Sequence, residues 1–202
     1  MTQLQKLPGP IKSVRVPMSD VEAAKSVTPP RFVRSESSRR FAVMGAAILE
    51  KMCRSGGLSV RARKTLPYIL DTARGKTAIS VMVSTVSGDP ATKHMIVPLT
   101  SIPAPPGVPH HVIVCAFVSK HERTREANGG LNVKLAGWAT GDEVMQHAKL
   151  GTPRVATSIA VASVPVHELH PIHALRHYLA PERKEPQEKG DSTCENHASD
   201  AS

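Results

Sequence analysis

Aromatic residues are scarce in this chain of 202 residues, which has three Phe, two Tyr and one Trp. Proteins that bind single-stranded nucleic acid without sequence preference stack the bases on aromatic side chains. This chain has few residues for such stacking. Cysteine is scarce too: Cys53, Cys115 and Cys194 are too few and too scattered for a disulfide framework or a zinc ribbon. We therefore expect reduced thiols, with Cys115 buried and inert inside an apolar run.

Long apolar runs are also missing. No stretch approaches the roughly 18 consecutive apolar residues of a transmembrane helix, and the first residues lack the apolar core of a signal peptide. The acidic residues Asp20 and Glu22 argue against an organellar transit peptide. These absences favour a cytoplasmic protein, and the length suits a single domain with a real core.

Positive charge is plentiful, at a formal net +9, but it is unevenly spread. Residues 1–40 hold eight Lys or Arg against three acids, and residues 41–120 hold nine against three. Residues 181–202 reverse the balance, with three against six. A basic first half suggests a polyanionic partner, most commonly nucleic acid. The alternative is that the charge only solubilises a surface and a disordered arm.

The distribution of proline and polar residues divides the chain into three parts. Residues 1–36 contain five prolines and few long apolar side chains, which predicts a flexible basic arm. Residues 181–202 are polar and acidic, which predicts a disordered tail. The remaining residues, 37–180, are expected to form one folded domain.

Hydrophobic periodicity predicts the elements of that domain. Residues 37–53 have the spacing of a helix, and Thr140-x-x-Glu143 forms a capping box that starts another helix, expected to reach residue 149. The run 111–118 is apolar without alternation, as in a central strand covered on both faces, and we expect helices on both. Further strands are predicted over 78–86, 94–99, 133–138 and 158–164.

Several short motifs in this order carry a resemblance to a known family. A strand ending in Gly137-Trp138 precedes the capped helix, and Val164-Pro165 followed by Leu169-x-Pro171 closes the domain. This arrangement, over roughly residues 38–178, resembles small nuclease-like proteins of the PD-(D/E)XK restriction-endonuclease superfamily, many of them from phages and mobile elements. The resemblance implies a mixed α/β (α+β) domain with a central mixed sheet flanked by helices. It also implies a nucleic-acid partner, with DNA favoured over RNA.

Active members of that superfamily carry an Asp at one strand and Glu-x-Lys on the next. The two carboxylates hold Mg²⁺, and the metal and the Lys help to generate and orient an attacking water. In this chain Asp71 stands where the resemblance expects the first Asp, but Val81 and Val83 stand where it expects Glu and Lys. The resemblance therefore implies a lost catalytic site that needs no cofactor.

The residues expected to contact nucleic acid are basic and lie from the end of the first predicted helix to the start of the first predicted strand. Contacts from such side chains to phosphates dominate non-specific binding. The predicted patch consists of Lys51, Arg54, Arg61, Arg63, Lys64, Arg74 and Lys76.

Histidines recur near the end of the domain, at His167, His170, His173 and His177. Imidazoles at such spacing can share a helix face and bind a metal. However, Pro171 interrupts the run, and no cysteine or carboxylate pair completes a zinc pattern. We interpret these histidines as solvated and predict no metal site.

Three functions remain open from the sequence. The first is a nucleic-acid-associated binding or scaffold component with a nuclease-like fold and an inactive metal site. The second is an active Mg²⁺-dependent endonuclease whose acids come from other positions, such as Asp71, Glu50 and Asp89. The third is a structural component of a larger ribonucleoprotein or phage assembly, in which the arm and the tail are docking segments.

Overall fold

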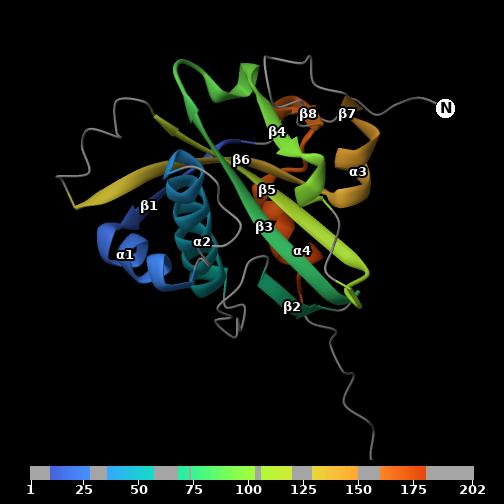
Figure 1. The fold of residues 1–202 in the computed structure, drawn as a ribbon, viewed down its shortest axis with the longest axis horizontal. Coiled ribbons are helices and arrows are strands. Elements are labelled where there is room, and N and C mark those ends of the chain that lie inside the picture. Colours follow the sequence, from blue (N-terminus) through green and yellow to red (C-terminus); the bar gives the residue numbers. More distant parts are fainter. Residues whose placement is uncertain are drawn as a thin grey trace, which may run out of the picture.

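The computed structural model describes residues 10–27, 36–56, 68–72, 74–102, 106–119, 129–149 and 160–180. Its helices and strands are, in chain order, β1 (Lys12–Pro17), α1 (Met18–Val27), α2 (Glu36–Gly56), β2 (Tyr68–Thr72), β3 (Gly75–Val86), β4 (His94–Pro98), β5 (His110–Ser119), β6 (Gly130–Thr140), α3 (Gly141–Gln146), β7 (Ala148–Lys149), β8 (Val161–Pro165) and α4 (Leu175–Tyr178). Short 3₁₀ turns connect several of them (Figure 1).

Two sheets organise the molecule. The larger has the strand order β1-β6-β5-β3-β2, with β3 and β5 parallel and the other neighbours antiparallel. The smaller has the order β4-β8-β7 and is antiparallel. The expected mixed α+β class is therefore confirmed.

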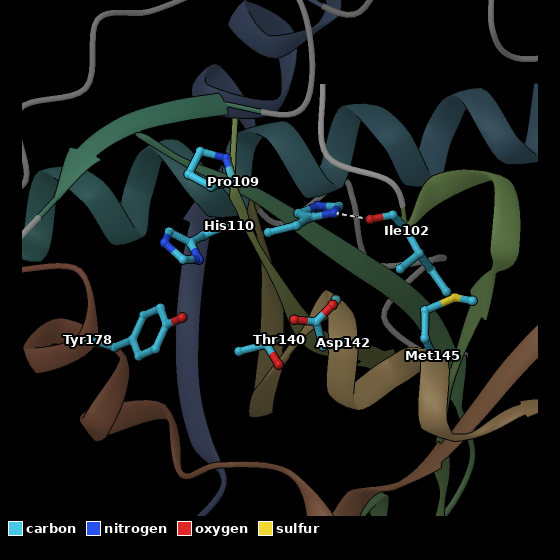
Figure 2. A pocket seen from close by; sticks show the side chains of 9 residues that line it. Ile102, Pro109, His110, Thr140, Asp142, Met145 and Tyr178 are labelled. Atoms are coloured by element: carbon cyan, nitrogen blue, oxygen red, sulfur yellow. Dashed lines mark hydrogen bonds between the residues drawn. The ribbon is translucent and has the colours of Figure 1, made fainter. Parts of the chain in front are cut away.

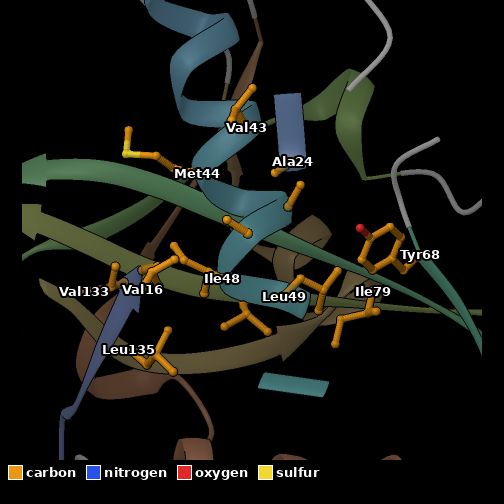
Figure 3. Close-up of a cluster of buried hydrophobic side chains, with 14 of the residues drawn as sticks. Val16, Ala24, Val43, Met44, Ile48, Leu49, Tyr68, Ile79, Val133 and Leu135 are labelled. Atoms are coloured by element: carbon orange, nitrogen blue, oxygen red, sulfur yellow. The ribbon is translucent and has the colours of Figure 1, made fainter. Parts of the chain in front are cut away.

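Helix α2 covers one face of the larger sheet (Figures 1 and 3). Its residues Ala46, Ala47, Ile48 and Leu49 are at most 1% exposed and belong to a core cluster that includes strand residues of the larger sheet. A Cβ atom at Gly45 would lie 2.9 Å from the carbonyl oxygen of Val81, so glycine lets the helix pack this closely on β3. Tyr68, Ile79 and Leu49 lie together in this cluster.

The opposite face carries a second cluster, in which Ile113, Cys115 and Phe117 of β5 meet residues of β4, β8 and α3. Because both faces are covered, every residue from 111 to 118 is buried, which explains the lack of alternation in this run. The cover differs from the expectation of helices on both faces. The three-stranded sheet and the short α3 cover the second face. Strands β4 and β8, whose residues alternate between buried and less buried, pack there in place of the expected helix.

The expectation of a flexible arm over residues 1–36 is wrong for residues 12–27. Strand β1 pairs along its whole length with β6, and α1 packs on α2 with Val21 and Ala24 buried. Val16 is fully buried in the first core cluster. Four of the five prolines that suggested an arm lie outside this segment, so an average over 36 residues concealed a local strand and helix. Residues 1–9, 28–35 and 181–202 lie outside the described part, which leaves the expected acidic tail as a prediction.

The capping box is confirmed at the start of α3. The Thr140 hydroxyl accepts from the Glu143 N–H at 3.3 Å, and the Glu143 carboxylate accepts from the Thr140 N–H at 2.9 Å. The helix ends at Gln146 rather than near residue 149, because Ala148–Lys149 pairs with β8 as β7. Strand β2 was not predicted, although it fixes the position of Asp71.

Candidate nucleic-acid interface

The candidate site lies at the end of the larger sheet where β5 begins and β6 ends. A hollow of about 300 Å³ opens there. His110, Asp142 and Tyr178 are among the residues that line it, and their side chains come from β5, α3 and α4 (Figure 2). Three elements distant in sequence therefore bring an imidazole, a carboxylate and a phenol to one opening.

Trp138 anchors residues 166–180, here called the closing segment, to β6 beside this hollow. Its backbone exchanges two hydrogen bonds with His170, of 3.0 and 2.8 Å, and its indole N–H donates to the carbonyl of Pro171 at 3.1 Å. The ring stacks on His170 with 4.5 Å between centroids and also packs against Tyr178 at 4.7 Å. Trp138 is only 3% exposed, so it joins α4 to the core.

Gly137 makes that close approach possible. A Cβ atom at this position would lie 2.6 Å from the His170 carbonyl oxygen and 2.7 Å from Cβ of Leu169, both closer than real Cβ contacts. The sequence pair Gly137-Trp138 thus marks the place where the closing segment crosses β6. The motif that suggested a family resemblance has a physical role in this fold.

A hydrogen-bond network extends this anchor to α3. His170 Nε2 donates to Glu143 Oε1 at 2.7 Å, and the same carboxylate caps α3. Burial by itself raises the pKa of Glu143, but the hydrogen bonds from Thr140 and His170 and the charge of His170 outweigh it and lower that pKa. The carboxylate therefore stays ionised and keeps both partners in place.

The histidines of this segment do not form the solvated group that we expected from the sequence. His167, His173 and His177 are exposed, but His170 is held between Trp138 and Glu143. The H-x₂-H spacing gave no sign of this difference. The sequence feature that could have indicated it is the pair Gly137-Trp138 on β6, because a glycine beside a large ring allows another segment to pack closely there.

Arg74 and Lys76 lie beside the hollow on the β2–β3 hairpin. The guanidinium of Arg74 lies over the ring of Tyr178, 4.5 Å from its centroid, in a cation–π contact. Lys76 is exposed. It directly precedes Thr77, which pairs with His110 of β5. Arg74 thus contacts a residue that lines the hollow, and Lys76 lies two residues further along the same hairpin.

The other predicted basic residues are only partly described. Lys51 is half-buried on α2, two residues after Leu49, which packs beside Tyr68 of β2 (Figure 3). The last part of α2, which includes Arg54, therefore ends toward the β2 end of the sheet. Arg61, Arg63 and Lys64 lie outside the described residues, and their contribution to the patch stays a prediction.

His111 lines the inner wall of the hollow and is held from two sides. Its Nδ1 donates to the Ile102 carbonyl at 2.6 Å, and its Nε2 accepts from the Ser80 hydroxyl at 2.5 Å. Burial lowers the pKa of His111, although the hydrogen bond to Ile102 opposes this effect. The ring is therefore neutral near pH 7 and adds no charge to the site.

Asp71 cannot share a metal site with Val81 and Val83. Asp71 is the register partner of Lys76 on β3, and successive side chains alternate between the faces of a sheet. Lys76 therefore shares a face with Ser80 and Met82, whereas Val81 and Val83 point the other way and pack on the first core cluster under α2. The register partner of Asp71 therefore precedes Val81 by five residues along β3, and the side chains of Asp71 and the two valines lie on opposite faces.

The other acids considered for a metal site are also far apart. Asp89 follows the far end of β3, where Val86 lies about 33 Å from Lys76 at the usual rise per residue. Its carboxylate caps a 3₁₀ turn by accepting from Ala91 N–H at 3.0 Å. Glu50 lies on α2, which covers the face opposite to Asp71. Among the described residues, no three His, Cys, Asp or Glu side chains gather where a metal ion could bind.

Cys115 is 1% exposed in the second core cluster, and burial raises the pKa of its thiol to about 12. This confirms the expectation of a buried, inert thiol.

Comparisons with known proteins find no match: no family model matches the chain, and neither curated proteins nor solved structures yield one. None of the helices within the described ranges is long and apolar enough to cross a membrane.

Proposed function

We propose that this protein binds nucleic acid through phosphate contacts at the β2–β3 end of the larger sheet, as a binding or scaffold component. The observation that supports this most is the fixed cation at the opening: Arg74 is held on Tyr178, which itself packs on the buried Trp138. An arginine held in this way keeps its N–H groups oriented, so less rotamer entropy is lost when it binds a phosphate.

The surrounding charge supports the same proposal. Lys76 and Arg176 are exposed on the neighbouring β3 and α4, and the predicted residues Lys51 and Arg54 lie on the helix that ends toward β2. Asp71 and Asp142 oppose them, so the local balance is positive without being uniformly so. Contacts from these cations to phosphates would position a nucleic acid without reading its sequence.

We further propose that the domain is a PD-(D/E)XK-like fold that does not cut nucleic acid, in a cytoplasmic protein, with DNA as the favoured partner. Support comes from Val81 and Val83, which pack against α2 and can supply neither a metal ligand nor a cation. The residues of β3 on the face of Asp71 add no second carboxylate; they are Lys76, Ala78, Ser80, Met82, Ser84 and Val86.

The test is a binding and cleavage assay on the full chain. We expect saturable binding to a fluorescent DNA duplex, weaker binding to RNA, and no cleavage of either with Mg²⁺ or Mn²⁺. Metal-dependent cleavage that Asp71→Asn abolishes would contradict the proposal and favour an active endonuclease. A chain that binds no nucleic acid by itself but joins a larger assembly would favour the structural role instead.

A further inference from the structure

A second hollow lies at the opposite end of the larger sheet, on the face that carries the second core cluster. Its volume is about 270 Å³, just below the roughly 300–1,000 Å³ of typical small-molecule sites. It is lined by Ser13, Ser87, Ser119, Asn132 and Lys134, together with Val86 and Gly88. Nothing in the nucleic-acid proposal uses these residues.

Strand register explains why these side chains meet. Ser13 of β1 pairs with Lys134 of β6, Lys134 pairs with Phe117 of β5, and Ser119 pairs with Val86 of β3. Paired residues share a face, and Val86 and Phe117 belong to the second cluster, so the polar residues point to that face as well. Four neighbouring strands thus contribute to one surface.

The hollow has a simple physical origin. Short hydroxyl side chains line this part of the face, which elsewhere carries Phe117 and other large apolar groups. A small side chain beside larger ones leaves space, and here the space is lined by hydroxyl donors. The turn after β3 adds Ser87 and Gly88, and Gly88 has a φ of 88° that suits glycine.

The chemistry of the lining selects an anion. Lys134 supplies one positive charge and the serines can donate hydrogen bonds, and none of the described residues that line the hollow is a carboxylate. Asp89, the next residue after Gly88, directs its carboxylate to the N–H of Ala91. By contrast, the hollow beside Trp138 includes Asp142 and is poorly suited to an anion in its interior.

We propose that this hollow is a binding site for a small phosphate monoester. Side-chain donors from β1, β5, β6 and the turn after β3 approach from several directions, which suits the three terminal oxygens of a tetrahedral phosphoryl group better than a planar carboxylate. The volume leaves room for a small organic part beside the phosphoryl group. The site is independent of the proposed nucleic-acid surface, which lies at the other end of β3.

The test is an NMR titration of the ¹⁵N-labelled full chain with ribose 5-phosphate, inorganic phosphate and ribose. We expect saturable shifts at the amides of Ser87, Gly88, Ser119 and Lys134 with ribose 5-phosphate, weaker binding of inorganic phosphate, and none of ribose. Lys134→Gln should weaken ribose 5-phosphate binding about tenfold, because a charge-assisted hydrogen bond is lost. Lys93→Gln, a change at an exposed lysine outside the hollow, should leave binding unchanged.

Three results would overturn the proposal. One is the absence of saturable shifts at these amides in a folded protein. Another is equal binding by Lys134→Gln and the unmodified chain. A third is equal affinity for inorganic phosphate and ribose 5-phosphate, which would assign the site to the free anion and remove the ester.

Discussion

The two ends of the larger sheet hold their polar residues in different ways. At the β2–β3 end, polar groups are fixed by packing: Arg74 lies on Tyr178, His111 lies between Ser80 and Ile102, and Glu143 lies between Thr140 and His170. At the other end, Ser13 and Lys134 project from exposed positions on β1 and β6. The difference teaches that the first end presents side chains held in place by their neighbours, whereas the second surrounds a hollow with exposed side chains.

Of the substitutions considered, removal of the Trp138 side chain should destabilise the β2–β3 end of the sheet the most. Trp138→Ala deletes a buried ring, two aromatic contacts and the hydrogen bond to Pro171, and it should lower the free energy of unfolding by about 3–5 kcal/mol. Chemical denaturation measures this loss. An unchanged denaturation midpoint would show that α4 is not anchored through this residue.

Gly137→Ala tests the close approach of the closing segment without removing any contact. The added methyl group would meet the backbone of His170, so we expect a loss of about 1–3 kcal/mol from local displacement. Gly75→Ala is the matched control, because Gly75 also has a positive φ, of 94° against 157° at Gly137, but an added Cβ there meets nothing within 4 Å. Equal stability of Gly137→Ala and the unmodified chain would contradict the crossing at β6.

The two ends can be compared directly by removing one serine hydroxyl from each. Ser80→Ala leaves the buried Nε2 of His111 without its partner, at a cost of about 1–3 kcal/mol. Ser119→Ala, at the half-buried rim of the open end, should change stability by about 0.5 kcal/mol or less. Similar losses for both would mean that the first end is no more rigid than the second.

The pH dependence of stability should follow His111. Its pKa is lowered in the folded chain, so the unfolded chain binds the proton more readily, and stability falls as pH drops below about 6.5. Replacement by Gln should flatten this part of the curve, while His177→Gln, at an exposed position, should not. Denaturation midpoints between pH 7.5 and 5 measure the effect, and an identical slope in His111→Gln would refute the assignment.

Local signals in the sequence predicted much of this fold. The capping box at Thr140 and Glu143 and the buried run of β5 needed only neighbouring residues to be recognised. The β1–α1 unit was missed because its few apolar residues, such as Val16 and Val21, become a core only when β6 and α2 are beside them. Long-range pairing of this kind has no local signature.

The candidate site was predictable only in part. Arg74 and Lys76 were expected to contact phosphates from charge alone, but the ring of Tyr178 beneath Arg74 depends on α4, about a hundred residues later in the chain. The face of the sheet on which Asp71 lies could not be assigned from the sequence, because β2 has no clear signal there.

The salt dependence of DNA binding tests the central claim most directly. The affinity for one DNA duplex would be measured at salt concentrations from about 50 to 200 mM. We would compare three proteins. They are the unmodified chain, the double variant Arg74→Gln/Lys76→Gln, and a matched double variant at the opposite end, Lys12→Gln/Lys134→Gln. Each phosphate contact adds roughly 0.9 to the slope of log K against log salt, so the first pair should reduce it by about 1.8 and the second should leave it unchanged. Equal slopes in all three proteins, or a loss only in the second pair, would contradict the account.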